Sequence, residues 1–123
     1  MGVARDIAEI AIGLLFAVGA VFNATYTRTH VRDFYGSFVV DSWFAPGRRL
    51  VERIVLPNAA IFNGGVVVFQ VAVAVAILSR GDLTTAGLTA GAVFASLAAL
   101  ASSPAGTAGN LALAGIQAAL ALT

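Results

Sequence analysis

The stretch LPNAAIFNGGVVVFQVAVAVAIL, residues 56–78, decides the class of fold because it is strongly apolar and contains no charged side chain. A helix of about 20 apolar residues crosses the roughly 30 Å hydrocarbon core of a bilayer. Residues 83–101 and 104–123 are also uncharged, and residues 7–26 contain a single charge, that of Glu9. The sequence therefore predicts an all-α, polytopic membrane four-helix bundle in one domain, with helices over about 7–26, 56–78, 83–101 and 104–122.

The composition excludes several classes of protein. Hydrophobic residues make up 59% of the chain and the mean hydropathy is +0.93, too apolar for a surface that faces water on all sides. The chain contains no Cys and one His, so it has no disulfide framework, no Cys-ligated cluster and no pair of axial haem ligands. We expect no metal site, no covalently attached cofactor and no nucleic-acid partner. Any redox chemistry would have to come from a group or partner that is not attached covalently.

The polar linker between the first two spans, residues 27–55, carries most of the basic side chains. By the positive-inside rule we expect this linker in the cytoplasm and both termini outside a cell membrane. An interfacial amphipathic helix is predicted over about residues 30–45, with its aromatic side chains at headgroup depth. A lid over a cavity at that face is the alternative. The linker arginines are Arg28, Arg32, Arg48, Arg49 and Arg53. The last three are predicted to contact lipid headgroups or a partner protein.

An internal repeat is visible in the second and fourth spans. Aligning Pro57 with Pro104 also aligns the amides of Asn63 with Asn110 and Gln70 with Gln117. The first and third spans share a weaker match, GAVF at residues 19–22 and again at residues 91–94. These matches predict two duplicated two-helix units, in which the second and fourth helices run parallel.

The spacing of the repeated amides places them on inward-facing surfaces. Seven residues is close to two helical turns, so Asn63 and Gln70 share one helix face, as do Asn110 and Gln117. An amide facing lipid would have no hydrogen-bond partner, so both faces should point into the bundle. The four side chains either tie helices together or line a binding site for a carbonyl-bearing lipid or small solute. The sequence leaves both interpretations open.

Small residues recur once per turn on the first and third spans, which favours close approach of helix backbones. The two stripes are Gly13, Ala17, Ala20, Ala24 and Gly87, Gly91, Ala95, Ala99.

Glu9 is the one acidic side chain inside a predicted span, on a face shared with Gly13, Phe16, Ala20 and Asn23. An intramembrane carboxylate can carry a proton, although near the helix start it could also reach headgroup water.

His30, Asp33 and Asp41 in the linker could act as acid or base, but their spacing matches no catalytic motif. No catalytic residue can therefore be named.

The chain resembles the DoxX-like family of small four-helix membrane proteins. The resemblance rests on AIGLLFAVGAVFNA in the first span, the aromatic linker, and PNAAIFNGGVVVFQVAVAVAILSRG through the second span and its turn. It implies a link to quinone-dependent redox chemistry. Members of the family usually carry an acidic residue where this chain has Gln70, so the resemblance does not support a proton-linked role there.

The leading functional expectation is a membrane subunit that is not an enzyme by itself. It would dock a redox partner protein and shelter a quinone or another isoprenoid lipid. A small proton-coupled transporter that forms homo-oligomers is the first alternative, with Glu9 as its proton-linked residue. A membrane-lipid-modifying enzyme is the second alternative, with His30 and the linker acids at the interface.

Overall fold

The computed structural model of the chain describes residues 2–122, and these residues form helices joined by short turns, with no strand among them. The first long helix is α1 (Gly2–Phe22), extended by a π-helical turn, η1 (Asn23–Thr27). The linker forms α2 (Val31–Asp41) and α3 (Ala45–Leu50). A π-helical turn, η2 (Val51–Val55), and a 3₁₀ turn, η3 (Leu56–Asn58), then lead into α4 (Ala59–Leu78). The chain ends with α5 (Leu83–Leu100) and α6 (Pro104–Leu122), so the all-α prediction is confirmed.

Four helical segments are long and apolar enough to cross a membrane, as predicted. They are Gly2–Thr27, Ala45–Leu78, Leu83–Leu100 and Pro104–Leu122. Each also exposes large apolar side chains on its outer face, a pattern that suits contact with lipid chains. Examples from α1, α4, α5 and α6 are Val18, Val68, Leu97 and Leu111. These features indicate a multi-pass membrane protein.

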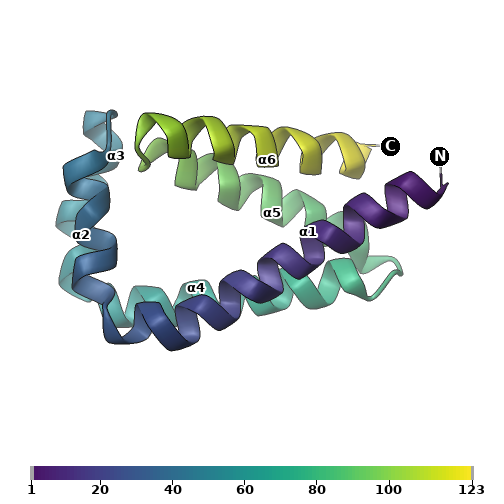
Figure 1. The fold of residues 1–123 in the computed structure, drawn as a ribbon, viewed down its shortest axis with the longest axis horizontal. Helices are drawn as coiled ribbons and strands as arrows, with labels where there is room; N and C mark the ends of the chain where they lie inside the picture. Colours follow the sequence, from purple (N-terminus) through teal and green to yellow (C-terminus); the bar gives the residue numbers. More distant parts are fainter. Residues whose placement is uncertain (1, 123) are drawn as a thin grey trace.

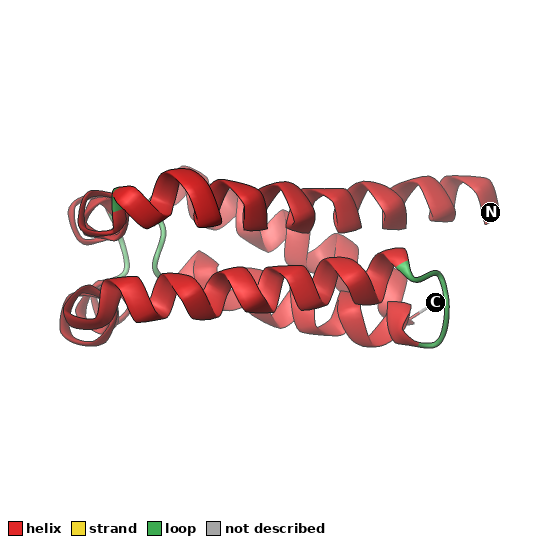
Figure 2. Ribbon diagram, turned by 90° about the horizontal axis from the view of Figure 1, so that it is seen from below, coloured by secondary structure: helices red, strands yellow, loops and turns green. Residues whose placement is uncertain are grey.

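The long helices form two antiparallel pairs (Figures 1 and 2). α1 packs along α4, α5 packs along α6, and α4 also contacts α5. The start of α1, the turn between α4 and α5, and the end of α6 lie at one end of the bundle (Figure 1). α2 and α3 stand across the other end, and α4 and α6 run in the same direction (Figure 1).

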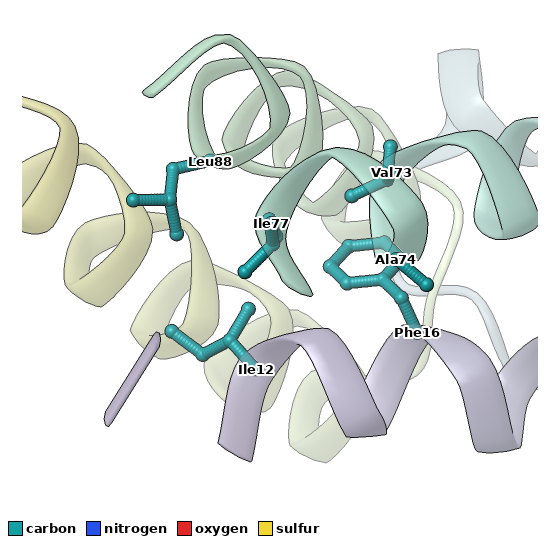
Figure 3. Packing of buried hydrophobic residues seen from close by; sticks show 6 residues of the cluster. All are labelled: Ile12, Phe16, Val73, Ala74, Ile77 and Leu88. Atoms are coloured by element: carbon teal, nitrogen blue, oxygen red, sulfur yellow. The ribbon is translucent and has the colours of Figure 1, made fainter. Parts of the chain in front are cut away.

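The main apolar core lies where α1, α4 and α5 meet. Phe16 of α1 points toward α4 beside Val73 and Ala74, while Ile77 lies between Ile12 and Leu88 (Figure 3). Glycines of the predicted stripes permit this close packing. A Cβ on Gly13 would come within 2.7 Å of the Leu78 side chain, and one on Gly87 within 2.8 Å of Ile77.

The stripe on α5 is buried along its whole length, from Gly87 to Ala99, and this confirms its predicted packing role. On α1 only part of the stripe is buried, because Ala17 is half-buried and Ala24 is exposed. The α1 face that contains Glu9 is buried along its length. Its members are all buried: Glu9, Gly13, Phe16, Ala20 and Asn23.

The segment from α2 through η2, residues 31–55 and here called the crosswise segment, packs on the protein itself. Tyr35 of α2 is buried with Val51, Val55 and Ala59, and the neighbouring apolar residues of α2 cover the same cluster. Tyr35 therefore contacts protein on all sides, and the expected headgroup depth of the aromatic face stays a prediction. The apolar face of α2 packs against the residues that lead into α4. This contact buries apolar side chains of both segments away from water, which stabilises it.

Two contacts fix the crosswise segment to the end of α5 and the start of α6. The indole N–H of Trp43 donates to Thr107 Oγ1 at 2.6 Å. Gly47 lies so close to the carbonyl oxygen of Leu100 that a Cβ there would overlap it. At the turn between α5 and α6 the Gly106 N–H donates to Ser103 Oγ at 3.2 Å, which caps the start of α6 as serine commonly does.

Candidate functional site

Two of the predicted amides belong to a buried hydrogen-bonded group, here called the amide network and made of Asn23, Tyr35, Asn63 and Gln70. Asn23 Nδ2 donates to Gln70 Oε1 at 2.8 Å, and Asn63 Nδ2 donates to the Asn23 carbonyl oxygen at 2.9 Å. The Tyr35 hydroxyl donates to Asn63 Oδ1 at 3.0 Å. The network therefore ties α1, α2 and α4 together.

Burial changes the ionisation of the tyrosine in this network. Loss of water contact disfavours the phenolate and raises the pKa of Tyr35 to about 12. The hydroxyl consequently stays protonated near neutral pH and remains a hydrogen-bond donor to Asn63.

The π-helical turn η1 leaves two polar oxygens inside the protein. Asn23 Oδ1 and Thr27 Oγ1 are buried, and neither has a hydrogen-bond partner among residues 2–122. Wider turns of this kind change which side chains point inward and are frequent at functional sites. Sequence reasoning placed Asn23 on the same face of the first span as Glu9 but did not identify it as the partner of Gln70.

The other two predicted amides lie apart from the network. Gln117 is fully buried, and its Nε2 donates to the Leu113 carbonyl of its own helix at 3.4 Å. Its Oε1 has no hydrogen-bond partner within the described part of the chain. Asn110 Nδ2 donates to Gly106 O at 2.9 Å and to Ser102 Oγ at 3.4 Å. Asn110 and Gln117 therefore share no hydrogen bond with the amide network or with each other.

Both buried glutamines pack against a glycine of a GAVF sequence. A Cβ on Gly19 of α1 would come within 2.9 Å of Gln70 Nε2. A Cβ on Gly91 of α5 would overlap Gln117 Oε1 and approach Phe16 to 3.0 Å. The same pair of residue types thus meets in the α1–α4 pair and in the α5–α6 pair.

Charged side chains close the opposite end of the bundle. Glu9 Oε2 accepts from Arg5 Nε at 3.2 Å, and Glu9 Oε1 accepts from Arg80 Nη1 at 2.8 Å. Arg80 also pairs with Asp6, and Arg5 Nη2 donates to the Leu120 carbonyl at 2.7 Å. These bonds join α1 to the α4–α5 turn and to the end of α6.

The turn that presents Arg80 is unusual in its backbone. Arg80 has a φ of 58°, in the left-handed region that non-glycine residues rarely adopt. The hydrogen bond to Glu9 is the main influence that raises the pKa of Arg80 above its ordinary value. Because both Glu9 oxygens accept from arginines, the geometry gives this carboxylate a structural role. A proton-linked function for Glu9 stays a prediction.

The linker residues considered for acid–base chemistry do not gather into one site. His30 stacks on Tyr26 with ring centroids 4.2 Å apart, and its Nδ1 lies 2.9 Å from the Tyr26 carbonyl oxygen. Asp33 and Asp41 are exposed on α2. Within residues 2–122 no three His, Cys, Asp or Glu side chains are grouped closely enough to hold a metal ion.

An open apolar groove of about 630 Å³ runs along the outer side of the α1–α4 pair. Sequence reasoning did not identify this groove. The small residues on α1 were a signal for it, because they leave space beside the valines of α4. Ser79 is its one polar lining residue. The apolar lining consists of Ala17, Ala20, Val21, Ala24, Val67, Val71, Ala74, Val75 and Leu78.

Comparison of the chain with protein-family models, with curated proteins and with solved structures finds no match. The likeness to DoxX-like proteins thus rests on the sequence features described above.

Proposed function

We propose that the chain is a small multi-pass membrane protein that holds the apolar tail of a quinone or another isoprenoid lipid in the groove between α1 and α4. The observation that carries this proposal is the groove itself, because nearly all its lining is aliphatic. From Val67 to Ser79 it follows α4 for about 18 Å at a rise of 1.5 Å per residue. A long hydrocarbon chain matches such a surface in both shape and polarity.

Two of the predicted amides fit this assignment because their side chains already bond within the protein. Asn63 and Gln70 already bond to Asn23 and Tyr35, so they act as ties between helices. Interhelical bonds of this kind contribute about 0.6 to 2 kcal/mol each. A lipid tail held outside the core would leave these bonds intact.

The duplicated unit is part of the proposal. Each unit has a glutamine packed on the glycine of a GAVF sequence, Gly19 with Gln70 and Gly91 with Gln117. This recurrence supports a duplication in which α1–α4 and α5–α6 are the two units.

The resemblance to DoxX-like proteins supports the wider role of a non-catalytic subunit. In this role the chain would present a quinone to a redox partner protein in the cell membrane, with the linker on the cytoplasmic side. A proton-coupled transporter or a lipid-modifying enzyme is less well supported, because Glu9 is held by two arginines and the linker acids are dispersed.

The test is the lipid content of the protein extracted from native membranes in a mild detergent. Ala24→Phe fills the groove from its exposed wall, whereas Ala11→Phe adds the same ring to an exposed position of α1 outside the groove. We expect the native chain and Ala11→Phe to carry an isoprenoid lipid in near-stoichiometric amount, and Ala24→Phe to lose most of it. Equal retention by both variants, or no isoprenoid lipid on the native chain, would rule the proposal out.

A further inference from the structure

The arginines of this chain fall into two classes that the structure separates clearly. Arg5 and Arg80 form ion pairs with Glu9 and Asp6 at one end of the bundle. The five linker arginines take part in no ion pair within residues 2–122. Their charges are therefore available to a partner outside the chain.

Three of these arginines lie close together on the crosswise segment, at Arg48, Arg49 and Arg53. Arg49 and Arg53 are exposed and stand one turn apart, opposite the buried Val51 and Val55. Arg48 is half-buried beside them. One acidic residue, Glu52, lies among them, so this short stretch keeps a net positive charge.

An exposed apolar pair accompanies these charges. Leu50 and Ile54 also stand one turn apart, between the arginine side of the helix and its buried side, and they are 52% and 56% exposed. A helical surface with basic and apolar stripes next to each other is suited to the boundary between headgroups and acyl chains.

The position and rigidity of the segment fit that boundary. α3 stands across the long helices at their shared end, and so would lie along the surface of a membrane crossed by the bundle (Figure 1). The bond from Trp43 to Thr107 and the contact of Gly47 with Leu100 hold the segment in place. A surface held in this way loses little conformational freedom when it binds a ligand.

We propose that Arg49 and Arg53, with Arg48 beside them, bind the phosphates of anionic phospholipids while Leu50 and Ile54 enter the acyl boundary. Arginine suits this ligand because its planar guanidinium group can donate two hydrogen bonds to phosphate oxygens. The inference goes beyond the isoprenoid groove, since it concerns another surface and another lipid, and it depends only on the membrane setting.

The experiment uses the full chain in nanodiscs of phosphatidylcholine with increasing fractions of phosphatidylglycerol. Retention of each lipid on the protein is measured by native mass spectrometry. Because each basic residue near an anionic surface contributes roughly a fivefold change in binding, Arg49→Gln/Arg53→Gln should lower the preference for phosphatidylglycerol by roughly 25-fold. Arg28→Gln/Arg32→Gln removes the same charge from the linker and should change the preference by less than about fivefold.

Two further measurements keep the test decisive. Arg49→Lys/Arg53→Lys keeps the charge but not the two-bond geometry, so it should lose less of the preference than the glutamine variant. Raising the salt concentration should weaken the preference of the native chain, because exposed charges are screened. Equal loss in the two glutamine variants, or no preference for phosphatidylglycerol in the native chain, would overturn the proposal. It would also be overturned if Arg49 and Arg53 affected the binding of a partner protein but not of phosphatidylglycerol.

Discussion

The two glutamine sites share one packing device but differ in hydrogen bonding. Gln70 lies on Gly19 and accepts from Asn23. Gln117 lies on Gly91, and its Oε1 has no hydrogen-bond partner among residues 2–122. The difference has a simple source in the sequence. One turn after Gly19 the chain has Asn23, but one turn after Gly91 it has the fully buried Ala95. The glutamine–glycine contact thus occurs in both helix pairs, but a side chain that bonds the glutamine oxygen follows the glycine in only one of them.

The contact of Gly91 is tighter than that of Gly19, and it predicts the largest loss of stability. Gly91→Ala should lower the free energy of unfolding by about 3 kcal/mol, because the added Cβ overlaps the Gln117 amide and crowds Phe16. Thermal or denaturant unfolding in a fixed detergent measures it. Gly115→Ala on α6 is the control, since nothing lies near its Cβ and it should gain up to about 1 kcal/mol from helix propensity. Comparable stability of the two variants would contradict this packing.

The hydrogen bonding of the two glutamines predicts the next effect. Gln70→Leu should lower the free energy of unfolding by about 2 kcal/mol, because it leaves the buried Asn23 amide without its acceptor. Gln117→Leu removes an amide whose oxygen has no partner in the described part of the chain, so the free energy of unfolding should change by less than about 1 kcal/mol. The same unfolding assay compares them, and a larger loss for Gln117→Leu would show that the comparison is wrong.

Tyr35 offers a smaller effect with a characteristic pH dependence. Tyr35→Phe should cost about 1 kcal/mol, since it removes the bond to Asn63. Burial raises the tyrosine pKa from 10.0 to about 12, so folding favours the protonated hydroxyl. That contribution is complete below pH 10 and is lost as the pH rises toward 12. Unfolding measured from pH 8 to 12 should show the native chain losing stability across this window more steeply than Tyr35→Phe. Parallel curves would exclude a buried, bonded hydroxyl.

Gly19 should show the smallest effect. A Cβ there meets only the end of the Gln70 side chain, which can shift, so Gly19→Ala should cost less than about 1 kcal/mol. The decisive quantity is its stability relative to Gly91→Ala in one detergent. If the two substitutions lower the free energy of unfolding equally, the tighter contact at Gly91 does not contribute more to stability than the contact at Gly19.

Much of the fold follows from local sequence patterns. Uncharged runs located the spanning helices, and small residues on α5 marked a buried face. These features depend on neighbours along one helix. The inward direction of Asn63, Gln70 and Gln117 follows from the same periodicity, because a lipid-facing amide would be unpaired.

The partners of these residues could not be predicted from the sequence. Glu9 meets Arg80 because the α4–α5 turn adopts a left-handed backbone at Arg80 that brings its side chain back to α1. Tyr35 reaches Asn63 only because α2 folds across the end of the bundle. Periodicity gives the face on which a side chain lies, but the neighbour of that face depends on how the helices pack.

The most direct test of the account is the isoprenoid lipid content of Gln70→Leu, measured per folded molecule beside the native chain and Ala24→Phe. The account assigns Gln70 to helix packing and the groove to the lipid. It therefore predicts that Gln70→Leu is less stable yet keeps its lipid, while Ala24→Phe stays folded and loses it. A folded Gln70→Leu protein without lipid, together with full retention by Ala24→Phe, would show that the ligand binds at the amides instead.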